Sequence, residues 1–135
     1  MATVEINNDR LNDLTVFTVH GDLCSDELIH HIKDFYAGNP TKLVLWDGTD
    51  GSQGNIATRE LKKVFDEMIR YSVKRKNGKT AFVAGFDVDY GIGRMYEAYG
   101  ECEHVPVAYR VFRSTEEALQ WLGVKEKDQL VAKSS

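Results

Sequence analysis

Lys-Thr-Ala-Phe-Val-Ala-Gly-Phe-Asp (79–87) followed by Val-Asp-Tyr-Gly-Ile-Gly-Arg-Met-Tyr-Glu-Ala-Tyr (88–99) is the stretch that decides the fold. Its first half is an apolar run of strand length. A short Gly/Asp segment joins that run to an amphipathic pattern with Ile92, Met95, Tyr96 and Tyr99 at helical spacing. A strand that leads directly into a helix is typical of βαβ units, so this stretch predicts a parallel sheet. It indicates no particular chemistry.

The rest of the chain alternates strand-like and helix-like segments in the same way. Segments rich in apolar or β-branched residues are predicted strands: Val4–Ile6, Leu14–His20, Leu43–Trp46, Ala81–Ala84 and Val107–Phe112. The first two are expected to form an antiparallel pair at a sheet edge. Helical patterns follow the later strands, beginning near an N-cap at Ser25, near Ile56, at an Asp87–Asp89 cap and at a Ser114–Glu117 capping box.

This order, β-β-α-β-α-β-α-β-α, predicts the fold class. Strands that alternate with helices form parallel sheets through right-handed crossovers. We therefore predict a single α/β domain with a mostly parallel mixed sheet of about five strands and about four helices. A chain of 135 residues is most simply one domain, 1–135. Its core is expected at residues 14–123, and its polar tail, 124–135, is expected to fray or to add a partial helical turn.

Two segments between the predicted strands and helices are predicted to be a flexible loop and a helix end. Asp47–Asn55 (Asp-Gly-Thr-Asp-Gly-Ser-Gln-Gly-Asn) is rich in Gly and Asp, and it is predicted to be the one long flexible loop. Lys74-Arg75-Lys76 precedes Asn77-Gly78, which is typical of a helix end whose basic last turn complements the helix dipole.

Composition restricts the classes of partner and compartment. Lys and Arg number 17 and Asp and Glu 21, so the net charge is −4, which argues against a nucleic-acid or anionic-membrane binder. Cys24 and Cys102 lie far apart in sequence, as expected of reduced thiols in a cytoplasmic protein. The N-terminus has no signal-peptide pattern, and no apolar run is long enough to span a membrane.

Three segments together resemble the SpoIIAA-like family of the STAS superfamily: Gly-Lys-Thr-Ala-Phe-Val (78–83), Tyr-Gly-Ile-Gly-Arg-Met-Tyr-Glu-Ala-Tyr (90–99) and Tyr-Arg-Val-Phe-Arg-Ser-Thr-Glu-Glu-Ala-Leu-Gln-Trp-Leu (109–122). The resemblance covers roughly Leu14 to Gly123. It implies a small α/β sandwich that often self-associates, hence a homodimer, and a fold similar to CRAL-TRIO lipid-binding domains. The better-known relatives are anti-anti-sigma factors, which bind a kinase-like protein partner and are switched off by phosphorylation of a serine.

The resemblance also indicates where a phosphorylated residue would lie. In the relatives the serine follows an Asp at the start of the helix after the second long strand, but residues 47–58 contain no Asp-Ser pair. Ser52 and Thr58 are the candidate acceptors, since a helix N-terminus suits added negative charge. The alternative is a Gly/Ser turn and a helix-cap threonine. Asp47 and Asp50 belong to the same segment, which is the expected contact surface for a partner.

A second group of candidate residues lies in the helix of the opening stretch. Gly91 and Gly93 could bring backbone N–H groups close to an anion, or they could allow close packing of the helix on its strand. Arg94 could hold a carboxylate or phosphate, or form a surface ion pair. Tyr90 and Tyr96 could line a pocket for a small apolar, lipid-like ligand, or they could belong to the core.

Nothing in the sequence predicts catalysis. There is no Gly-x-Ser-x-Gly elbow, no cysteine cluster and no His-x-x-x-His, and the adjacent His30 and His31 point to different faces of a helix. We therefore expect no catalytic residue, no metal site and no cofactor. The predicted function is a non-catalytic, cytoplasmic protein-interaction or regulatory module, and the alternative is a carrier or sensor of a small apolar ligand.

Overall fold

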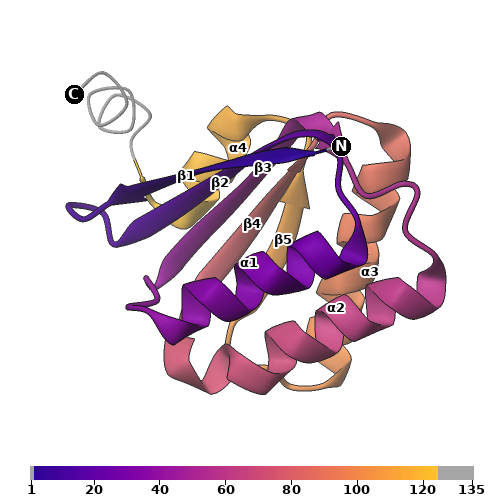
Figure 1. Ribbon diagram of the computed structural model, residues 1–135. Helices are drawn as coiled ribbons and strands as arrows, with labels where there is room; N and C mark the ends of the chain where they lie inside the picture. The colour runs from indigo at the N-terminus through magenta and orange to yellow at the C-terminus, as the bar shows by residue number, and fades with distance from the viewer. Residues whose placement is uncertain (1, 125–135) are drawn as a thin grey trace.

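The chain folds into a five-stranded sheet with helices on both faces (Figure 1). The computed structural model describes residues 2–124. Its elements, in chain order, are β1 (Thr3–Asp9), β2 (Leu14–Asp22), α1 (Ser25–Ala37), β3 (Leu43–Ser52), α2 (Thr58–Tyr71), η1 (Ser72–Arg75), β4 (Lys79–Ala84), α3 (Asp87–Cys102), β5 (Ala108–Phe112) and α4 (Thr115–Leu122). The predicted fold class and the predicted order of elements are confirmed.

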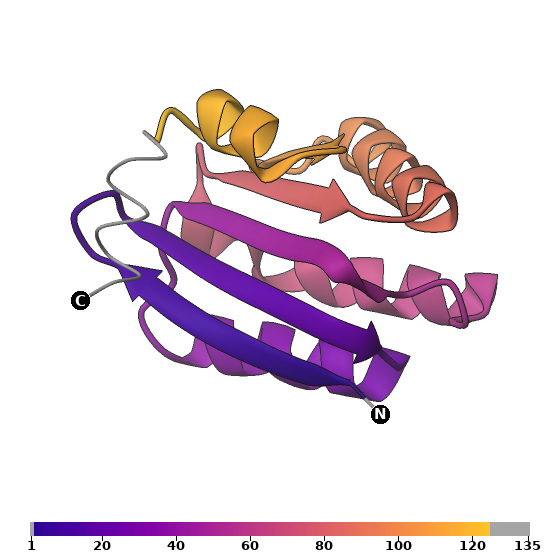
Figure 2. The same ribbon diagram turned by 90° about the horizontal axis from the view of Figure 1, so that it is seen from above.

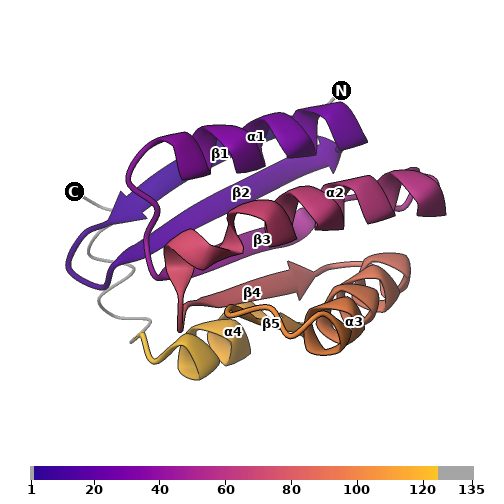
Figure 3. The ribbon, with the colours of Figure 1, turned by 90° about the horizontal axis from the view of Figure 1, so that it is seen from below.

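The strands lie in the sheet in chain order, β1-β2-β3-β4-β5. The predicted antiparallel pairing of β1 with β2 is confirmed, and every later pair is parallel. Each crossover from β2 to β5 steps the same way across the sheet. Right-handed crossovers therefore place α1, α2 and α3 on one face, as Figures 2 and 3 show. The last described helix, α4, follows β5 and covers the opposite face.

The alternation of side chains along the strands divides the core in two. On the face of α1, α2 and α3, the larger core includes Val19, Phe82, Tyr96 and Val111. On the other face the smaller core packs around α4 and consists of Leu14, Val16, Leu45, Ala81, Val83, Ala118, Leu119, Leu122 and Val124. The inner strands β2, β3 and β4 thus carry apolar residues on both sides, as buried parallel strands do.

The prediction of a flexible loop at Asp47–Asn55 is wrong for its first half. β3 continues to Ser52, because β2 offers it a second stretch of parallel pairing, with Asp50 opposite His20 and Ser52 opposite Asp22. Gly51 suits this strand because a Cβ there would lie 2.6 Å from Cγ1 of Val19. The connecting loop is shorter, residues 53–57, and we call it the Gln53 loop.

Two predicted helix starts are displaced by one residue or more. Cys24, not Ser25, is the N-cap of α1, and its backbone N–H donates to Oε1 of Glu27 at 3.2 Å. Phe86 is the N-cap of α3, so Asp87 and Asp89 lie in its first turn instead of capping it. Ser114 is confirmed as the N-cap of α4, where its hydroxyl accepts the Glu117 N–H at 3.2 Å.

The prediction that Arg75 only complements a helix dipole is also wrong. Its side chain is buried, with 4% of its surface exposed. Its guanidinium donates to the carbonyls of Thr41, Lys42 and Lys79 at 2.8–2.9 Å, and to the hydroxyls of Thr80 and Tyr36. Arg75 therefore ties together the segments that lead into β3 and β4.

The predicted polar tail lies almost entirely outside the described residues, because only Val124 is placed. Among residues 2–124, no helix combines the length and the apolar character needed to cross a membrane.

Gly93 allows α3 to pack closely on β5. A Cβ at Gly93 would lie 2.5 Å from Cγ2 of Val111, whereas Gly91, two residues earlier, faces open space. We expect Gly93→Ala to lower the free energy of unfolding by about 1–2 kcal/mol, because overpacking outweighs the gain in helix propensity. Gly91→Ala should raise it by about 0.5–1 kcal/mol. Urea denaturation of both variants checks the opposite signs, and equal effects would contradict the packing role of Gly93.

Candidate functional site

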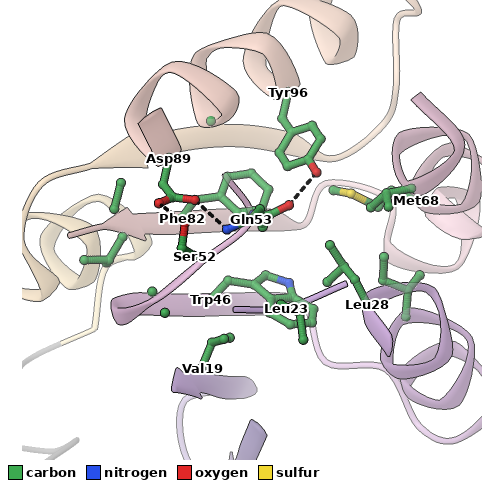
Figure 4. A pocket seen from close by; sticks show the side chains of 17 residues that line it. Val19, Leu23, Leu28, Trp46, Ser52, Gln53, Met68, Phe82, Asp89 and Tyr96 are labelled. Carbon is green, nitrogen blue, oxygen red and sulfur yellow. Dashed lines mark hydrogen bonds between the residues drawn. The ribbon is translucent and has the colours of Figure 1, made fainter. Parts of the chain in front are cut away.

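The candidate site lies at the carboxyl ends of the parallel strands, where open α/β sheets commonly bind their ligands. There α1, α2 and α3 close over β2, β3 and β4 and leave a cavity of about 50 Å³ (Figure 4). Most of its lining is apolar and aromatic, and the polar groups gather on one side. The lining residues are Val19, Leu23, Leu28, Ile32, Trp46, Gly48, Gly51, Ser52, Gln53, Val64, Met68, Phe82, Val83, Ala84, Asp89, Gly93 and Tyr96.

A buried carboxylate organises the polar side of the cavity. Asp89 is 8% exposed and lies in the first turn of α3. Its Oδ2 accepts a hydrogen bond from the Ser52 hydroxyl at 2.9 Å, and its Oδ1 accepts one from the Gln53 backbone N–H at 2.7 Å. The Ser52 hydroxyl in turn accepts the Gly54 N–H at 2.9 Å. Asp89 thus fastens the end of β3 and the start of the Gln53 loop to α3.

A second hydrogen bond fastens the same loop from its other side. The buried hydroxyl of Tyr96 donates to Oε1 of Gln53 at 2.8 Å. Burial raises the pKa of Tyr96 far above its usual range, and the nearby charge of Asp89 raises this pKa further. The phenol therefore stays protonated and keeps its role as donor. Figure 4 shows Gln53 lying between Asp89 and Tyr96, so both groups hold one residue of the loop.

The dimensions of the cavity limit what it can hold in this conformation. A cavity of about 150 Å³ accommodates benzene, and roughly 10–15 Å³ suffices for one water molecule. The 50 Å³ here therefore suits a few water molecules or a very small group, not a lipid chain. Among residues 2–124, no three His, Cys, Asp or Glu side chains gather as metal ligands do.

The structure brings together only some of the candidate residues from the sequence. Ser52, Gly93 and Tyr96 line the cavity. Asp47 and Asp50 lie on β3, away from that lining: Asp47 accepts from the Thr49 hydroxyl, and Asp50 lies 3.9 Å from Nδ1 of His20.

The remaining candidates lie on the surface around the site. Thr58 is exposed as the first residue of α2. Gly91 is exposed, and Arg94 forms an ion pair with Glu97 at 3.3 Å. The guanidinium carbon of Arg113 lies over the ring of Tyr90, 4.2 Å from the centre of that ring. For Gly93 the structure therefore has close packing of the helix, and for Arg94 it has a surface ion pair.

Sequence reasoning missed Asp89 and Gln53, the two residues that link the loop to α3. Asp89 was expected to help cap a helix, and an Asp in a first turn normally needs no other explanation. Its only further signal is its place in the i, i+3, i+4 series of buried positions with Ile92, Gly93 and Tyr96.

Two exposed apolar side chains lie at the start of α3, and one of them, Val88, lies beside the Gln53 loop. Phe86 and Val88, at the start of α3, are 50% and 53% exposed. The loop approaches Val88 closely, since a Cβ at Gly54 would lie 3.0 Å from Cγ1 of Val88. We call the Gln53 loop, Thr58, Phe86 and Val88 together the loop end of the domain.

The comparisons with known proteins support the fold. No protein-family model matches the sequence, and no curated protein matches it. Among solved structures, an uncharacterised protein with a SpoIIAA-like fold from Shewanella loihica is 17% identical, with a TM-score of 0.55 over 90% of this chain and 93% of its own.

Two further solved structures are anti-sigma factor antagonists. One is SpoIIAA in its unphosphorylated form, 9% identical, with a TM-score of 0.53 over 85% of this chain and 92% of its own. The other comes from Mycobacterium paratuberculosis, 13% identical, with a TM-score of 0.56 over 91% of this chain and 95% of its own. The chain therefore has a SpoIIAA-like fold, and the resemblance found in the sequence is confirmed in the three-dimensional structure.

Proposed function

We propose that this protein is a non-catalytic, cytoplasmic regulatory module that binds a protein partner through its loop end. The observation that carries the proposal is the pair of exposed apolar side chains at the start of α3, Phe86 and Val88, of which Val88 lies beside a loop that hydrogen bonds hold in place. Exposed apolar groups beside a preorganised polar loop are a common basis for protein recognition, because little ordering entropy is lost on binding. The anti-sigma factor antagonists among the similar structures add support from fold analogy.

The same geometry separates the two candidate phospho-acceptors. The Ser52 hydroxyl already bonds to the buried carboxylate of Asp89, so a phosphate there would face a like charge in a site with little water. Thr58 is exposed at the N-terminus of α2, where the helix dipole and the free backbone N–H groups favour an anion. If the proposed partner binding is regulated by phosphorylation, we infer that Thr58 is the acceptor.

A carrier of a lipid-like ligand is the less favoured function. Its support is the apolar lining of the cavity, but the volume of about 50 Å³ leaves no room for an acyl chain while α1, α2 and the Gln53 loop keep their positions.

A charge placed in the apolar part of the loop end tests the proposal. We expect Val88→Asp to lower partner capture at least about tenfold, since a buried carboxylate without a partner is costly at the centre of an interface. The measurement is quantitative mass spectrometry of proteins captured from native cell extract by the full-length chain.

Val73→Asp is the matched control. Val73 is the same residue type and is also exposed, at 73% against 53% for Val88, but it lies in η1 near the amino end of β4, at the other end of the domain. A specific partner is retained by wild type and by Val73→Asp and is lost from Val88→Asp. Equal capture by the two variants would refute the loop end as the binding surface.

A further inference from the structure

The two edge strands of the sheet, β1 and β5, differ in length and in the hydrogen bonding of their backbone. β5 is a short edge of five residues, and the carboxylate of Glu97 on α3 accepts the Val111 backbone N–H at 3.1 Å. β1 is seven residues long, and it pairs with β2 without a register shift. Among the described residues, no strand lies on its outer side. Alternate residues of such an edge direct both N–H and C=O outward, where they can pair with another strand.

The sequence of β1 lacks most of the usual devices that keep edges apart, and Glu5 is its one exposed charge. Thr-Val-Glu-Ile-Asn-Asn-Asp (3–9) contains no Pro, Lys or Arg, and the strand has no bulge. Ile6 at its centre is 46% exposed. An edge of this length, with an exposed β-branched residue at its middle and no positive charge, favours pairing with a further strand.

The charges of β1 are compatible with those of β1 in a second copy in one register. Only an antiparallel register centred on Ile6 pairs all seven residues, and it sets Ile6 against Ile6, Glu5 against Asn7 and Thr3 against Asp9. No two like charges then stand opposite each other. Moving the centre to Glu5 or Asn7 sets Glu5 against Glu5 or against Asp9, and like charges directly opposite are destabilising.

The register centred on Ile6 also fits the layers of the fold. Side chains of directly paired residues lie on the same side of a sheet. Because Ile6 opposes Ile6, the two-fold axis stands perpendicular to the sheet, and α1, α2 and α3 of both copies lie on one side of it. We propose that the protein forms a homodimer in which β1 pairs antiparallel with β1 of a second copy around Ile6, joining two five-stranded sheets into one.

This interface is independent of the loop end. The two β2 strands of such a dimer run in opposite directions, so the carboxyl ends of the parallel strands, and with them the two loop ends, point to opposite ends of the joint sheet. Each copy therefore keeps its loop end open. The homodimer expected from the sequence thus has a defined interface that does not compete with the proposed partner.

The mass of the full-length chain in solution tests the proposal. Light scattering coupled to size exclusion should give twice the chain mass of 15.3 kDa for wild type. Ile6→Lys should give the monomer mass, because two lysines would face each other on the two-fold axis. Leu11→Lys is the matched control: Leu11 is exposed in the β1–β2 turn outside the proposed interface, so this variant should remain dimeric. A monomeric wild type, or an Ile6→Lys variant that stays dimeric, would overturn the proposal.

A charge exchange gives a second test that does not depend on the stability of a single variant. Asn7→Glu places a new carboxylate opposite Glu5 of the other copy at two symmetric positions, and it should weaken the dimer about tenfold. Glu5→Lys combined with Asn7→Glu turns both contacts into attractive pairs and should restore the wild-type dissociation constant. Sedimentation at several concentrations measures both, and failure of the double variant to restore the dimer would contradict the register.

Discussion

Arg75→Ala should lower the free energy of unfolding by about 3–5 kcal/mol, the largest effect we expect of any single substitution in this chain. The guanidinium donates to three backbone carbonyls and two hydroxyls, and almost none of it reaches water. Removing it leaves these buried acceptors without their donor and opens a cavity under the ring of Phe35, whose centre lies 5.6 Å from the guanidinium carbon.

Arg75→Lys separates the contribution of charge from that of geometry. A lysine keeps the positive charge but has its three donors on one atom. It therefore cannot reach the carbonyls before β3 and the carbonyl in β4 at the same time, as the planar guanidinium does. We expect a loss close to that of Arg75→Ala. Lys76→Ala, at the exposed neighbouring position, is the control and should change stability by less than about 0.5 kcal/mol. Urea denaturation at one protein concentration measures all three, and a loss below about 1 kcal/mol for Arg75→Ala would refute this structural role.

Asp89→Ala should lower the free energy of unfolding by about 2–4 kcal/mol and should also free the Gln53 loop. The substitution removes a charged acceptor from the Ser52 hydroxyl and the Gln53 N–H, and it takes a negative charge from the first turn of α3. Hydrogen exchange gives a local measure: the amide protons of Gln53 and Gly54 should exchange faster, because both belong to this network.

Asp87→Ala is the matched control for Asp89. Both aspartates lie in the first turn of α3, but Asp87 is exposed and pairs with Arg113 in solvent. Its loss should cost no more than about 1 kcal/mol and leave exchange in the Gln53 loop unchanged. If the two substitutions have the same effect, Asp89 contributes only to the helix dipole, and the loop is held by other contacts.

The comparison of these two aspartates illustrates the limits of sequence reasoning. The sequence places both in the same first turn, and only the helical spacing of Asp89 from Ile92, Gly93 and Tyr96 sets it apart from Asp87. The structure separates them because Asp89 faces β3 across the cavity and contacts a serine 37 positions earlier in the chain. Gln53 joins the same network because Tyr96, 43 positions later, reaches it.

The end of β3 shows the same limit in the backbone. The Gly and Asp content of residues 47–52 favours a loop, and by local propensity it should be one. The segment is a strand because β2 runs beside it far enough to pair with Asp50, Gly51 and Ser52. β-propensity reports mainly how a residue packs on its neighbours, and those neighbours are distant in the sequence.

The amino-acid sequence by itself determined the number and order of the strands and helices, the antiparallel edge pair, the cap at Ser114 and the similarity to SpoIIAA-like proteins. These features depend on periodicity and capping within a few residues, which local sequence encodes directly. The burial of Arg75, the extension of β3 and the Asp89 network were decided only by the tertiary structure. Each depends on hydrogen bonds or strand pairs between segments some 30 residues apart or more, and their free energy exists only once the sheet has brought those segments together.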